Sequence, residues 1–282
     1  MNIHVIDTGF FKLDGGAMFG VVPKSIWNKT NPADENNLCT WAMRCLLIED
    51  GKRLILIDTG LGDKQDEKFF SHYHLHGDDT LEKSILAKGF HPNDITDVFL
   101  THLHFDHVGG ATLYNSDKSK INLRFPNATY WSDKDHWNWA KFPNAREKAS
   151  FLKENLAPIE ESGNLKFVEN KLSPFSCMDL LFVDGHTEQQ MLPVIHYKGK
   201  TIVYVADLFP SVSHIPLPYI MSYDVRPLKT LEEKNEFLAK SVDNNYILFF
   251  EHDPTIQCCT VKRTEKGIRP DHMFFLNEIF ND

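Results

Sequence analysis

Three histidines and one aspartate fall within six residues in the segment Thr101-His102-Leu103-His104-Phe105-Asp106-His107. This segment follows the apolar run Val98-Phe99-Leu100, which is typical of a buried strand, and precedes Gly109-Gly110. If the strand persists through them, His102 and His104 lie on the same side, because side chains alternate along a strand. Asp106 and His107 come as the chain turns. We therefore expect the first pair to bind one metal ion and the second pair to reach another ion nearby.

The ligand types in this segment indicate which metal to expect. Imidazole with carboxylate suits zinc, and iron, cobalt and manganese are alternatives. Because isolated histidines pair by chance on protein surfaces, a single His-x-His would be weak support for a metal site. Three histidines and a carboxylate directly after a strand are far rarer, and they favour two Zn²⁺ ions per chain.

Composition and charge narrow the class of protein. The chain has 282 residues, 42% hydrophobic and 24% charged, which is typical of a globular protein with a sizeable core. Its formal net charge of −9 and pI near 5.8 repel phosphate, so we expect no nucleic-acid partner. No stretch approaches the roughly 18–20 apolar residues of a membrane span. The start of the chain lacks signal-peptide features, and five cysteines without a CxxC pair favour reduced thiols, so we expect a cytoplasmic protein.

Short apolar runs alternate with helical patterns along the chain, which predicts an α/β fold. A helix is expected from Thr230, where Thr230-Leu231-Glu232-Glu233 fits a capping box, and another over Arg146–Leu156, stopped by Pro158. Ser132 is expected to cap a short helix, and Lys198-Gly199-Lys200 to form a hairpin turn. The expected strands are Ile3–Thr8, Met43–Glu49, Arg53–Asp58, Asp97–Leu100, Ala128–Trp131, Leu180–Asp184, Met191–Tyr197, Lys200–Ala206 and Tyr246–Phe250.

The segment 101–107 resembles the HxHxDH motif of metallo-β-lactamase-fold hydrolases. Further landmarks of that superfamily follow in the same order: Leu54–Gly60 with Asp58, Asp184-Gly185-His186-Thr187, Val205-Ala206-Asp207 and Phe250-Glu251-His252-Asp253. The resemblance covers nearly the whole chain. It implies an αββα sandwich, with two mixed sheets flanked by helices, and one hydrolase domain spanning residues 1–282.

The resemblance also implies a ligand set. His102, His104 and His186 would bind the first metal ion, Asp106, His107 and His252 the second, and Asp207 would bridge both. Asp58 would orient a ligand histidine from behind, which is a common role of carboxylates near metals. Two zinc ions roughly 3.5–4 Å apart can bind a bridging hydroxide at neutral pH, so the expected reaction is hydrolysis of an ester-like bond.

The carboxylate at position 207 narrows the substrate class. True β-lactamases of this superfamily generally place a cysteine there, whereas the segment from Asp207 to Asp253 resembles the branch of N-acyl-homoserine lactonases and organophosphate hydrolases. Many of those lactonases carry a tyrosine shortly after the bridging aspartate, which this chain lacks. His214 or Tyr223 could substitute for it in holding the substrate carbonyl.

Two apolar loops, Gly15–Leu38 and Pro210–Pro227, favour an acyl substrate over a nucleic acid. An acyl lactone has an alkyl tail, and the loops offer side chains for an apolar channel: Met18, Phe19, Val22, Trp27, Ile215, Leu217 and Met221. We expect a quorum-quenching lactonase, with a phosphotriesterase or arylesterase as the alternative. A non-catalytic, metal-stabilised binding protein is a third hypothesis. Apolar residues in Gly15–Leu38 also favour an interface and hence a homodimer.

Overall fold

The computed structural model describes residues 1–279, which separate into two compact units. The first unit comprises Met1–Gly9, Met43–Pro174 and Gln189–Met191, and the second comprises Phe10–Ala42, Phe175–Glu188 and residues 192–279. Strands β1 (Asn2–Asp14), β2 (Leu38–Asp50) and β10 (Gln190–Tyr197) contribute residues to both.

The first unit is built on a mixed six-stranded sheet. Its strand order is β1-β2-β3-β4-β7-β8, with β3 (Arg53–Ile57), β4 (Asp97–Phe99), β7 (Thr129–Ser132) and β8 (Leu165–Phe167). Strands β2 and β3 are antiparallel, whereas β3, β4, β7 and β8 run parallel. Parallel strands end at the same edge, so residues that follow β3 and β4 are brought together. A small hairpin, β5 (Thr112–Tyr114) with β6 (Ile121–Leu123), stands apart from this sheet.

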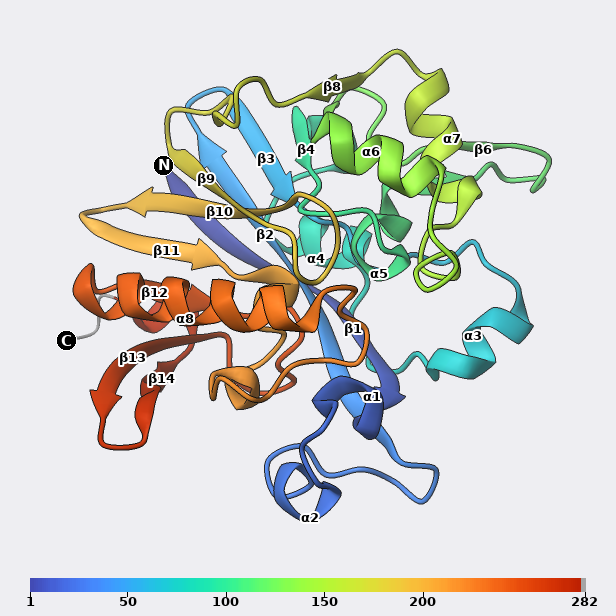
Figure 1. Ribbon diagram of the computed structural model, residues 1–282. Coiled ribbons are helices and arrows are strands. Elements are labelled where there is room, and N and C mark those ends of the chain that lie inside the picture. Colours follow the sequence, from blue (N-terminus) through green and yellow to red (C-terminus); the bar gives the residue numbers. More distant parts are fainter. Residues whose placement is uncertain (280–282) are drawn as a thin grey trace. The chain divides into compact units, whose positions relative to one another are not determined.

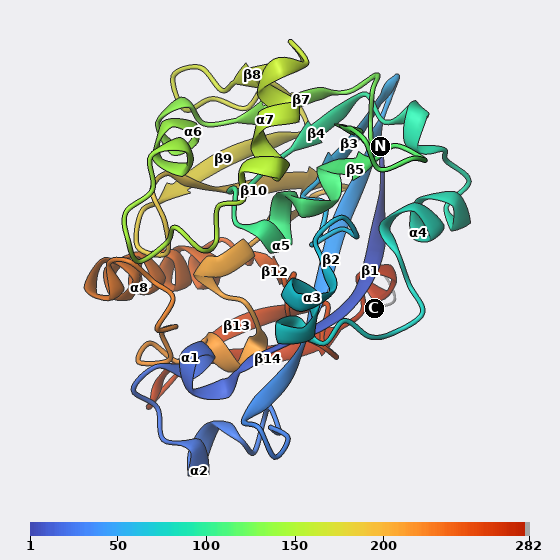
Figure 2. The ribbon, with the colours of Figure 1, turned by 90° about the vertical axis from the view of Figure 1, so that its right-hand side faces the viewer.

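Helices cover this sheet through one apolar core. They are α4 (Leu81–Ala87), α5 (Phe105–Val108), α6 (Lys134–Lys141) and α7 (Lys153–Glu161), with 3-10 turns η1 (Pro92–Asp94) and η2 (Gly109–Ala111). Helix α3 (Glu67–Tyr73) has no buried residue and contributes none to this core. Buried Leu56 and Tyr130 of the strands pack with Ile85, Trp137 and Ile159 of the helices. Figure 2 shows α6 and α7 beside β4 and β7.

Two helix boundaries in this unit differ from the sequence-based expectation. Helix α6 is capped by Asp133, one residue after the predicted Ser132, and the Asp133 carboxylate accepts from the amides of Asp135 and His136. Helix α7 begins at Lys153 and contains Pro158 instead of stopping before it. Proline removes the amide that would bond the carbonyl of Glu154, and the hydroxyl of Thr112 donates to that carbonyl at 3.4 Å.

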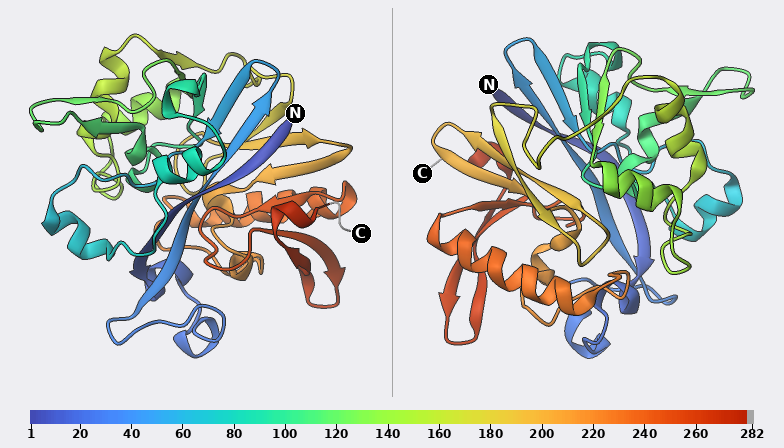
Figure 3. Two further views of the ribbon diagram at one scale, coloured as in Figure 1. Left: turned by 180° about the vertical axis from the view of Figure 1, so that it is seen from behind. Right: turned by 45° about the horizontal axis from the view of Figure 1, so that its top comes forward.

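The second unit contains the other mixed six-stranded sheet, in the order β14-β13-β12-β11-β10-β9. Its strands are β9 (Met178–Val183), β10, β11 (Lys200–Tyr204), β12 (Ile247–Phe249), β13 (Cys258–Thr264) and β14 (Gly267–Phe274). Strands β11 and β12 run parallel, whereas β10 pairs with β11, β12 with β13 and β13 with β14 in antiparallel fashion. Lys198 and Gly199 have positive φ and form the predicted two-residue turn between β10 and β11. Figure 3 shows β13 and β14 as a red hairpin.

Helices of the second unit are two short ones near the start of the chain and one long one. They are α1 (Gly15–Phe19), α2 (Lys24–Trp27) and α8 (Pro227–Asp243), with 3-10 turns η3 (Ala206–Leu208), η4 (Val212–His214) and η5 (Leu276–Glu278). Helix α8 lies along the second sheet (Figure 1). It starts at Pro227, three residues before the predicted cap at Thr230, because proline is well suited to the first helical position.

The predicted fold class is confirmed: the chain has two large mixed sheets together with helices. Strands β5, β6, β8, β13 and β14 were not predicted from the sequence. All five cysteines are buried and none forms a disulfide within the described residues. Between residues 1 and 279, no helix combines the length and apolar character needed to cross a membrane.

One close backbone approach in the first unit gives a testable prediction. A Cβ atom at Gly109 would lie 2.0 Å from the carbonyl oxygen of Leu61, and both groups are backbone or fixed to it. We expect Gly109→Ala to lower the free energy of unfolding by about 1–3 kcal/mol or more, as overpacking does. Gly51→Ala is the control for a glycine in open space: nothing lies within 4 Å of its Cβ position, so its loss should be limited to the strain of a side chain at φ +61°, roughly 1 kcal/mol. Urea unfolding curves showing equal losses for both variants would contradict this.

Candidate metal centre

In the first unit, the loops after β3 and β4 are locked together by Asp58. The amide of Asp58 donates to the carbonyl of Phe99 at 2.9 Å. The Asp58 carboxylate accepts from the amide and the hydroxyl of Thr101, at 2.8 and 2.6 Å. Because β3 and β4 are parallel, both residues leave the same edge of the sheet. This fixes the backbone immediately before His102.

The motif itself does not continue the strand. Strand β4 ends at Phe99, so His102 lies in the following loop and His104 is the N-cap residue of α5. Asp106 and His107 lie in the single turn of that helix. The ring of His102 lies 4.6 Å from that of His104 and 3.8 Å from that of His107, measured between centroids. The three imidazoles therefore lie close together. They are placed by a loop and a helical turn, and not by the alternation of side chains along a strand that was expected.

Carboxylates lie behind two of these histidines. Nδ1 of His107 is 3.1 Å from Oδ2 of Asp58, so the second carboxylate oxygen of Asp58 serves both Thr101 and His107. Nε2 of His104 is 3.5 Å from Oε1 of Glu147, which is only 2% exposed. A histidine that is oriented through one ring nitrogen can ligate a metal through the other. Asp58 was expected in this position from the sequence, whereas Glu147 was not.

A further histidine supports the backbone of the motif. The ring nitrogen Nε2 of His136 accepts a hydrogen bond from the amide of Leu103 at 2.9 Å. His136 is buried in helix α6, and nothing in its sequence neighbourhood distinguished it. The hydrogen bond from Leu103 to His136 could not be predicted from the sequence, because it forms only when α6 packs beside the motif.

In the second unit, the ends of two parallel strands bring together Asp207 and His252. Strand β11 leads into Asp207, and β12 leads through Phe250 and Glu251 to His252. Ala206 has φ +39°, an unusual value for a residue with a side chain, and it turns the backbone directly before Asp207. Strained backbone at such a position is a frequent mark of a functional site.

The carboxylate of Asp207 lies between two imidazoles of the same unit. Its Oδ2 is 3.0 Å from Nε2 of His186, and its Oδ1 is 3.1 Å from Nε2 of His252. Nδ1 of His186 bonds Asp224 at 2.8 Å, and Nδ1 of His252 bonds the carbonyl of Ala42 at 2.8 Å. Each imidazole is thus oriented through Nδ1 and presents Nε2 to Asp207. Asp224 was not predicted from the sequence.

The negative charges around His186 favour a positive charge on its ring, which either a proton or a metal ion could supply. Burial by itself lowers the pKa of His186, but the negative charges and hydrogen bonds of Asp207 and Asp224 outweigh it and raise the pKa to about 10. A cation on Nε2 is therefore favoured in this environment. A metal ion at that nitrogen has to displace the proton, so metal binding is expected to weaken as pH falls.

The two apolar loops meet within the second unit, but as a packed core. The Phe19 ring stacks on Trp27 and on His214, with centroid distances of 5.3 and 4.5 Å. The predicted channel residues Met18, Phe19, Val22, Trp27, Ile215 and Met221 are all less than 9% exposed. Leu217 is half-buried. Because six of the seven are buried, the structure does not show them as the wall of an open channel, and their binding role stays a prediction.

His214 is placed differently from the sequence-based expectation. One ring nitrogen bonds the hydroxyl of Ser211 at 2.8 Å and the other the carbonyl of Met18 at 2.9 Å. Burial lowers its pKa to about 3, so the ring is neutral. Since protein atoms occupy both nitrogens, His214 joins the two loops and does not offer a donor to a substrate carbonyl. Tyr223, the other suggested substitute, is 39% exposed.

A tyrosine from helix α3 is a residue that the sequence did not reveal. The ring of Tyr73 lies 4.8 Å from that of Phe105, the residue between His104 and Asp106. Phe69, one turn earlier, packs on both rings. Burial, and secondarily the negative charge of Asp106, raise the pKa of Tyr73 to about 12, so its phenol stays protonated.

The chain belongs to the metallo-beta-lactamase superfamily. The sequence profile of that superfamily matches residues 44–252, more than half of the chain, and the matched range includes all seven predicted ligands. The chain is therefore a hydrolase of this superfamily.

Individual relatives agree with this assignment. An N-acyl homoserine lactonase of Bacillus cereus is 24% identical over 242 residues, which cover 81% of this chain and 87% of the lactonase. The crystal structure of a probable metal-dependent hydrolase from Staphylococcus aureus is 28% identical, with a TM-score of 0.87 over 97% of this chain and 96% of its own. The dizinc quorum-quenching lactonase AidC is 24% identical, with a TM-score of 0.78 over 98% of this chain and 95% of its own.

The contact between Asp58 and His107 predicts an effect on metal affinity. Asp58→Asn leaves one oxygen to accept from Thr101 and His107, so we expect zinc affinity to fall about 10–100-fold, as is usual for such partners. Affinity is measured by competition with a chromophoric chelator. Asp97→Asn is the control, because Asp97 is a buried carboxylate at the opposite end of β4. Equal zinc affinity in wild type and Asp58→Asn would contradict the role assigned to Asp58.

The buried neutral ring of His214 predicts a pH dependence of stability. The unfolded imidazole takes up a proton near pH 6.5, but the folded one only near pH 3. The unfolded state therefore binds more protons in this window, and stability falls as pH drops through it. With metal removed by a chelator, the stability advantage of wild type over His214→Gln should shrink from pH 6.5 to pH 3. A pH-independent difference in urea unfolding would show that His214 is not buried as a neutral ring.

Proposed function

We propose that this chain binds two divalent metal ions, zinc in the first instance, through the seven predicted ligands. The first ion would take His102, His104 and His186, and the second Asp106, His107 and His252. The observation that supports this most directly is the carboxylate of Asp207, whose two oxygens face two different imidazoles at 3.0 and 3.1 Å. A carboxylate held in this way can give one oxygen to each of two ions.

The donor chemistry fits such ions. Five buried imidazoles and two aspartates are the ligand types that zinc uses, and the outer hydrogen bonds orient the rings in advance. The carboxylates of Asp106 and Asp207 are buried, and burying them without a cation would be costly. The superfamily profile spans both units, so we also propose that residues 1–282 form one hydrolase domain.

We further propose that the substrate is an N-acyl-homoserine lactone, as for the relatives that bear this activity in their names. A carboxylate at position 207, where true β-lactamases generally carry cysteine, supports a lactonase-type site. When bound, the metal ions would act as Lewis acids on the substrate carbonyl and would lower the pKa of water, so that hydroxide is available at neutral pH to attack that carbonyl.

The residues of the chain supply the remaining steps. As the new C–O bond forms at the carbonyl carbon and the ring C–O bond breaks, a proton must reach the departing ring oxygen. Asp106 is the carboxylate proposed to carry it. The phenol of Tyr73 stays protonated near Asp106. We propose that its hydroxyl, and not the ring of His214, donates a hydrogen bond to the substrate carbonyl.

Assembly stays a prediction. Val21 is 90% exposed and Ile26 48% exposed in the segment that was expected to form a homodimer interface. Met18, Phe19, Val22 and Trp27 of that segment are buried within the second unit, and Leu38 is partly buried. A dimer contact there would therefore have to use the tip of the loop.

The proposed function predicts an order of rates. Zinc-loaded protein should open medium-chain acyl-homoserine lactones faster than a bare γ-lactone and faster than an aryl phosphotriester. Asp106→Asn should lower the lactone rate by about 10²–10⁴, the usual contribution of a general acid. Asp117→Asn, at an exposed aspartate in the β5–β6 loop, is the control. Faster turnover of the phosphotriester would favour the alternative function, and no turnover of any of the three would favour a non-catalytic protein.

A further inference from the structure

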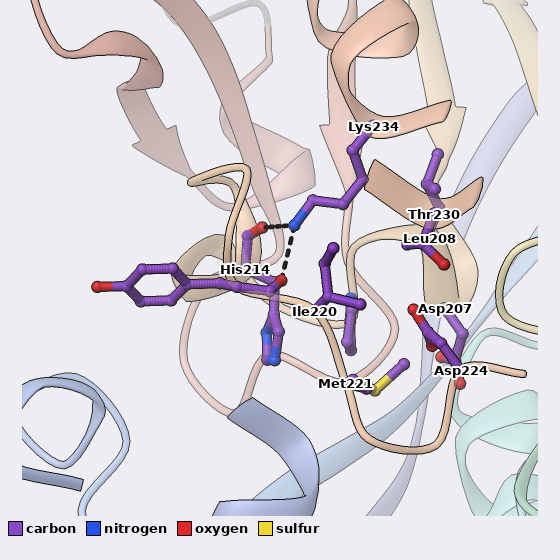
Figure 4. A pocket seen from close by; sticks show the side chains of 10 residues that line it. Asp207, Leu208, His214, Ile220, Met221, Asp224, Thr230 and Lys234 are labelled. Atoms are coloured by element: carbon purple, nitrogen blue, oxygen red, sulfur yellow. Dashed lines mark hydrogen bonds between the residues drawn. The ribbon is translucent and has the colours of Figure 1, made fainter. Parts of the chain in front are cut away.

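Lys234 is a buried cation whose three donors are all used by one loop. It lies in α8 and is 1% exposed. Its Nζ donates to the carbonyls of His214 at 2.6 Å, Pro216 at 3.2 Å and Tyr219 at 2.7 Å. Figure 4 shows Nζ with two of these bonds, in a narrow recess that also contains Asp207 and Asp224. The carbonyls come from six consecutive residues, so the ammonium group gathers a short stretch of backbone.

The sequence of this stretch explains why it needs such a donor. Pro216 and Pro218 lack amide hydrogens, so the stretch from His214 to Tyr219 cannot form regular helix or strand hydrogen bonds. Buried carbonyls without partners are costly, and an ammonium group offers three N–H donors from one compact centre. An arginine fork is planar and cannot direct three donors at one point in this way.

The stretch held by Lys234 leads directly to the partner of a predicted metal ligand. Five residues after Tyr219, Asp224 bonds Nδ1 of His186 at 2.8 Å. The chain on either side is also tied down: the amide of Ser222 donates to Ala17 at 2.7 Å, and that of Val225 donates to the carbonyl of His186 at 3.2 Å. The 214–219 carbonyls and Asp224 thus lie on one short backbone segment, and a shift of the carbonyls would act on the anchors at Ser222 and Val225 that place Asp224.

The residue before Lys234, Glu233, holds the backbone next to His186, the partner of Asp224. The carboxylate of Glu233 accepts from the amides of Asp184 and Gly185, at 2.8 and 3.0 Å, directly before His186. Two successive residues of α8 thus fix the segment that carries His186 and the segment that carries Asp224. Electrostatics agree with the proximity: burial lowers the pKa of Lys234 to about 7, and the charge of Asp224 acts in the opposite direction.

We propose that Lys234 is a positioning residue that, through the 214–224 segment, holds Asp224 against His186 and so sets the affinity of that histidine for metal. The inference rests on the proposed metal site. It assigns to α8 a part in metal binding although no residue of α8 is a predicted ligand.

A double-mutant cycle on zinc affinity tests this. We expect Lys234→Met and Asp224→Asn each to lower the affinity about 10-fold or more, as loss of an outer partner does. The double variant should bind zinc as weakly as Asp224→Asn alone, because both changes remove the same effect. Additive losses, or unchanged affinity in Lys234→Met, would overturn the inference. If wild type binds no zinc, the proposed metal site itself fails, and the inference falls with it.

Leu238→Ala separates this effect from general loss of stability. Leu238 lies one turn further along α8 and is also 1% exposed, but it does not bond the 214–219 carbonyls. It should destabilise the protein, yet leave zinc affinity within about twofold of wild type, because sites without shared partners act independently. A loss equal to that of Lys234→Met would show that destabilisation alone lowers metal binding.

A readout that needs no metal completes the test. In the metal-free protein, hydrogen exchange at the amides of Ser222 and Val225 should speed up in Lys234→Met but not in Leu238→Ala. If Lys234→Met does not fold, Lys234→Arg is used instead. It keeps the positive charge and should still show both the faster exchange and the weaker zinc binding. Unchanged exchange at both amides would overturn the proposed route from Lys234 to Asp224.

Discussion

The structure depends on holding imidazoles of the predicted metal centre through one ring nitrogen, as those of His107, His186 and His252 are held, so that the other nitrogen has a fixed direction. The acceptors are varied: a carboxylate from a strand end, a carboxylate from a connecting segment and a main-chain carbonyl. They are Asp58 for His107, Asp224 for His186 and the carbonyl of Ala42 for His252. The carboxylate of Glu147 lies 3.5 Å from Nε2 of His104 as a charged neighbour. Because a buried imidazole without such a partner would rotate or lose its hydrogen bonds, these outer groups decide how well the ligands are prepared for a metal ion.

Both units place their predicted ligands at the ends of parallel strands. A pair of parallel strands ends at one edge, and the loops that follow carry the chemistry: β3 and β4 in the first unit, β11 and β12 in the second. Sharp backbone features come immediately before the functional groups, namely the cap formed by His104 and the positive φ of Ala206. The functional groups are then supported by helices that contribute no ligand, as Lys234 and Glu233 of α8 illustrate.

Sequence alone was sufficient for features that are local along the chain. The strands near the motif, the 198–199 turn and the α/β class follow from apolar periodicity and turn residues. Groups recruited by tertiary structure were missed: Glu147, His136, Asp224 and Lys234 are ordinary polar residues until folding places them. The sequence also cannot distinguish a channel wall from a packed core, because apolar residues such as Phe19 and Trp27 are typical of both. For His214 the sequence left open whether the ring reaches a substrate or packs in the loop, because it cannot show that Ser211 and Met18 occupy both ring nitrogens.

We propose that the seven predicted ligands bind two metal ions and that these ions share the carboxylate of Asp207. Calorimetric titration of zinc into the metal-free protein tests this most directly, because it counts ions without reference to any substrate. We expect two ions per chain in wild type and loss of tight binding of both in Asp207→Ala, since one carboxylate would serve both ions. A single ion in wild type, or two tightly bound ions in Asp207→Ala, would contradict it.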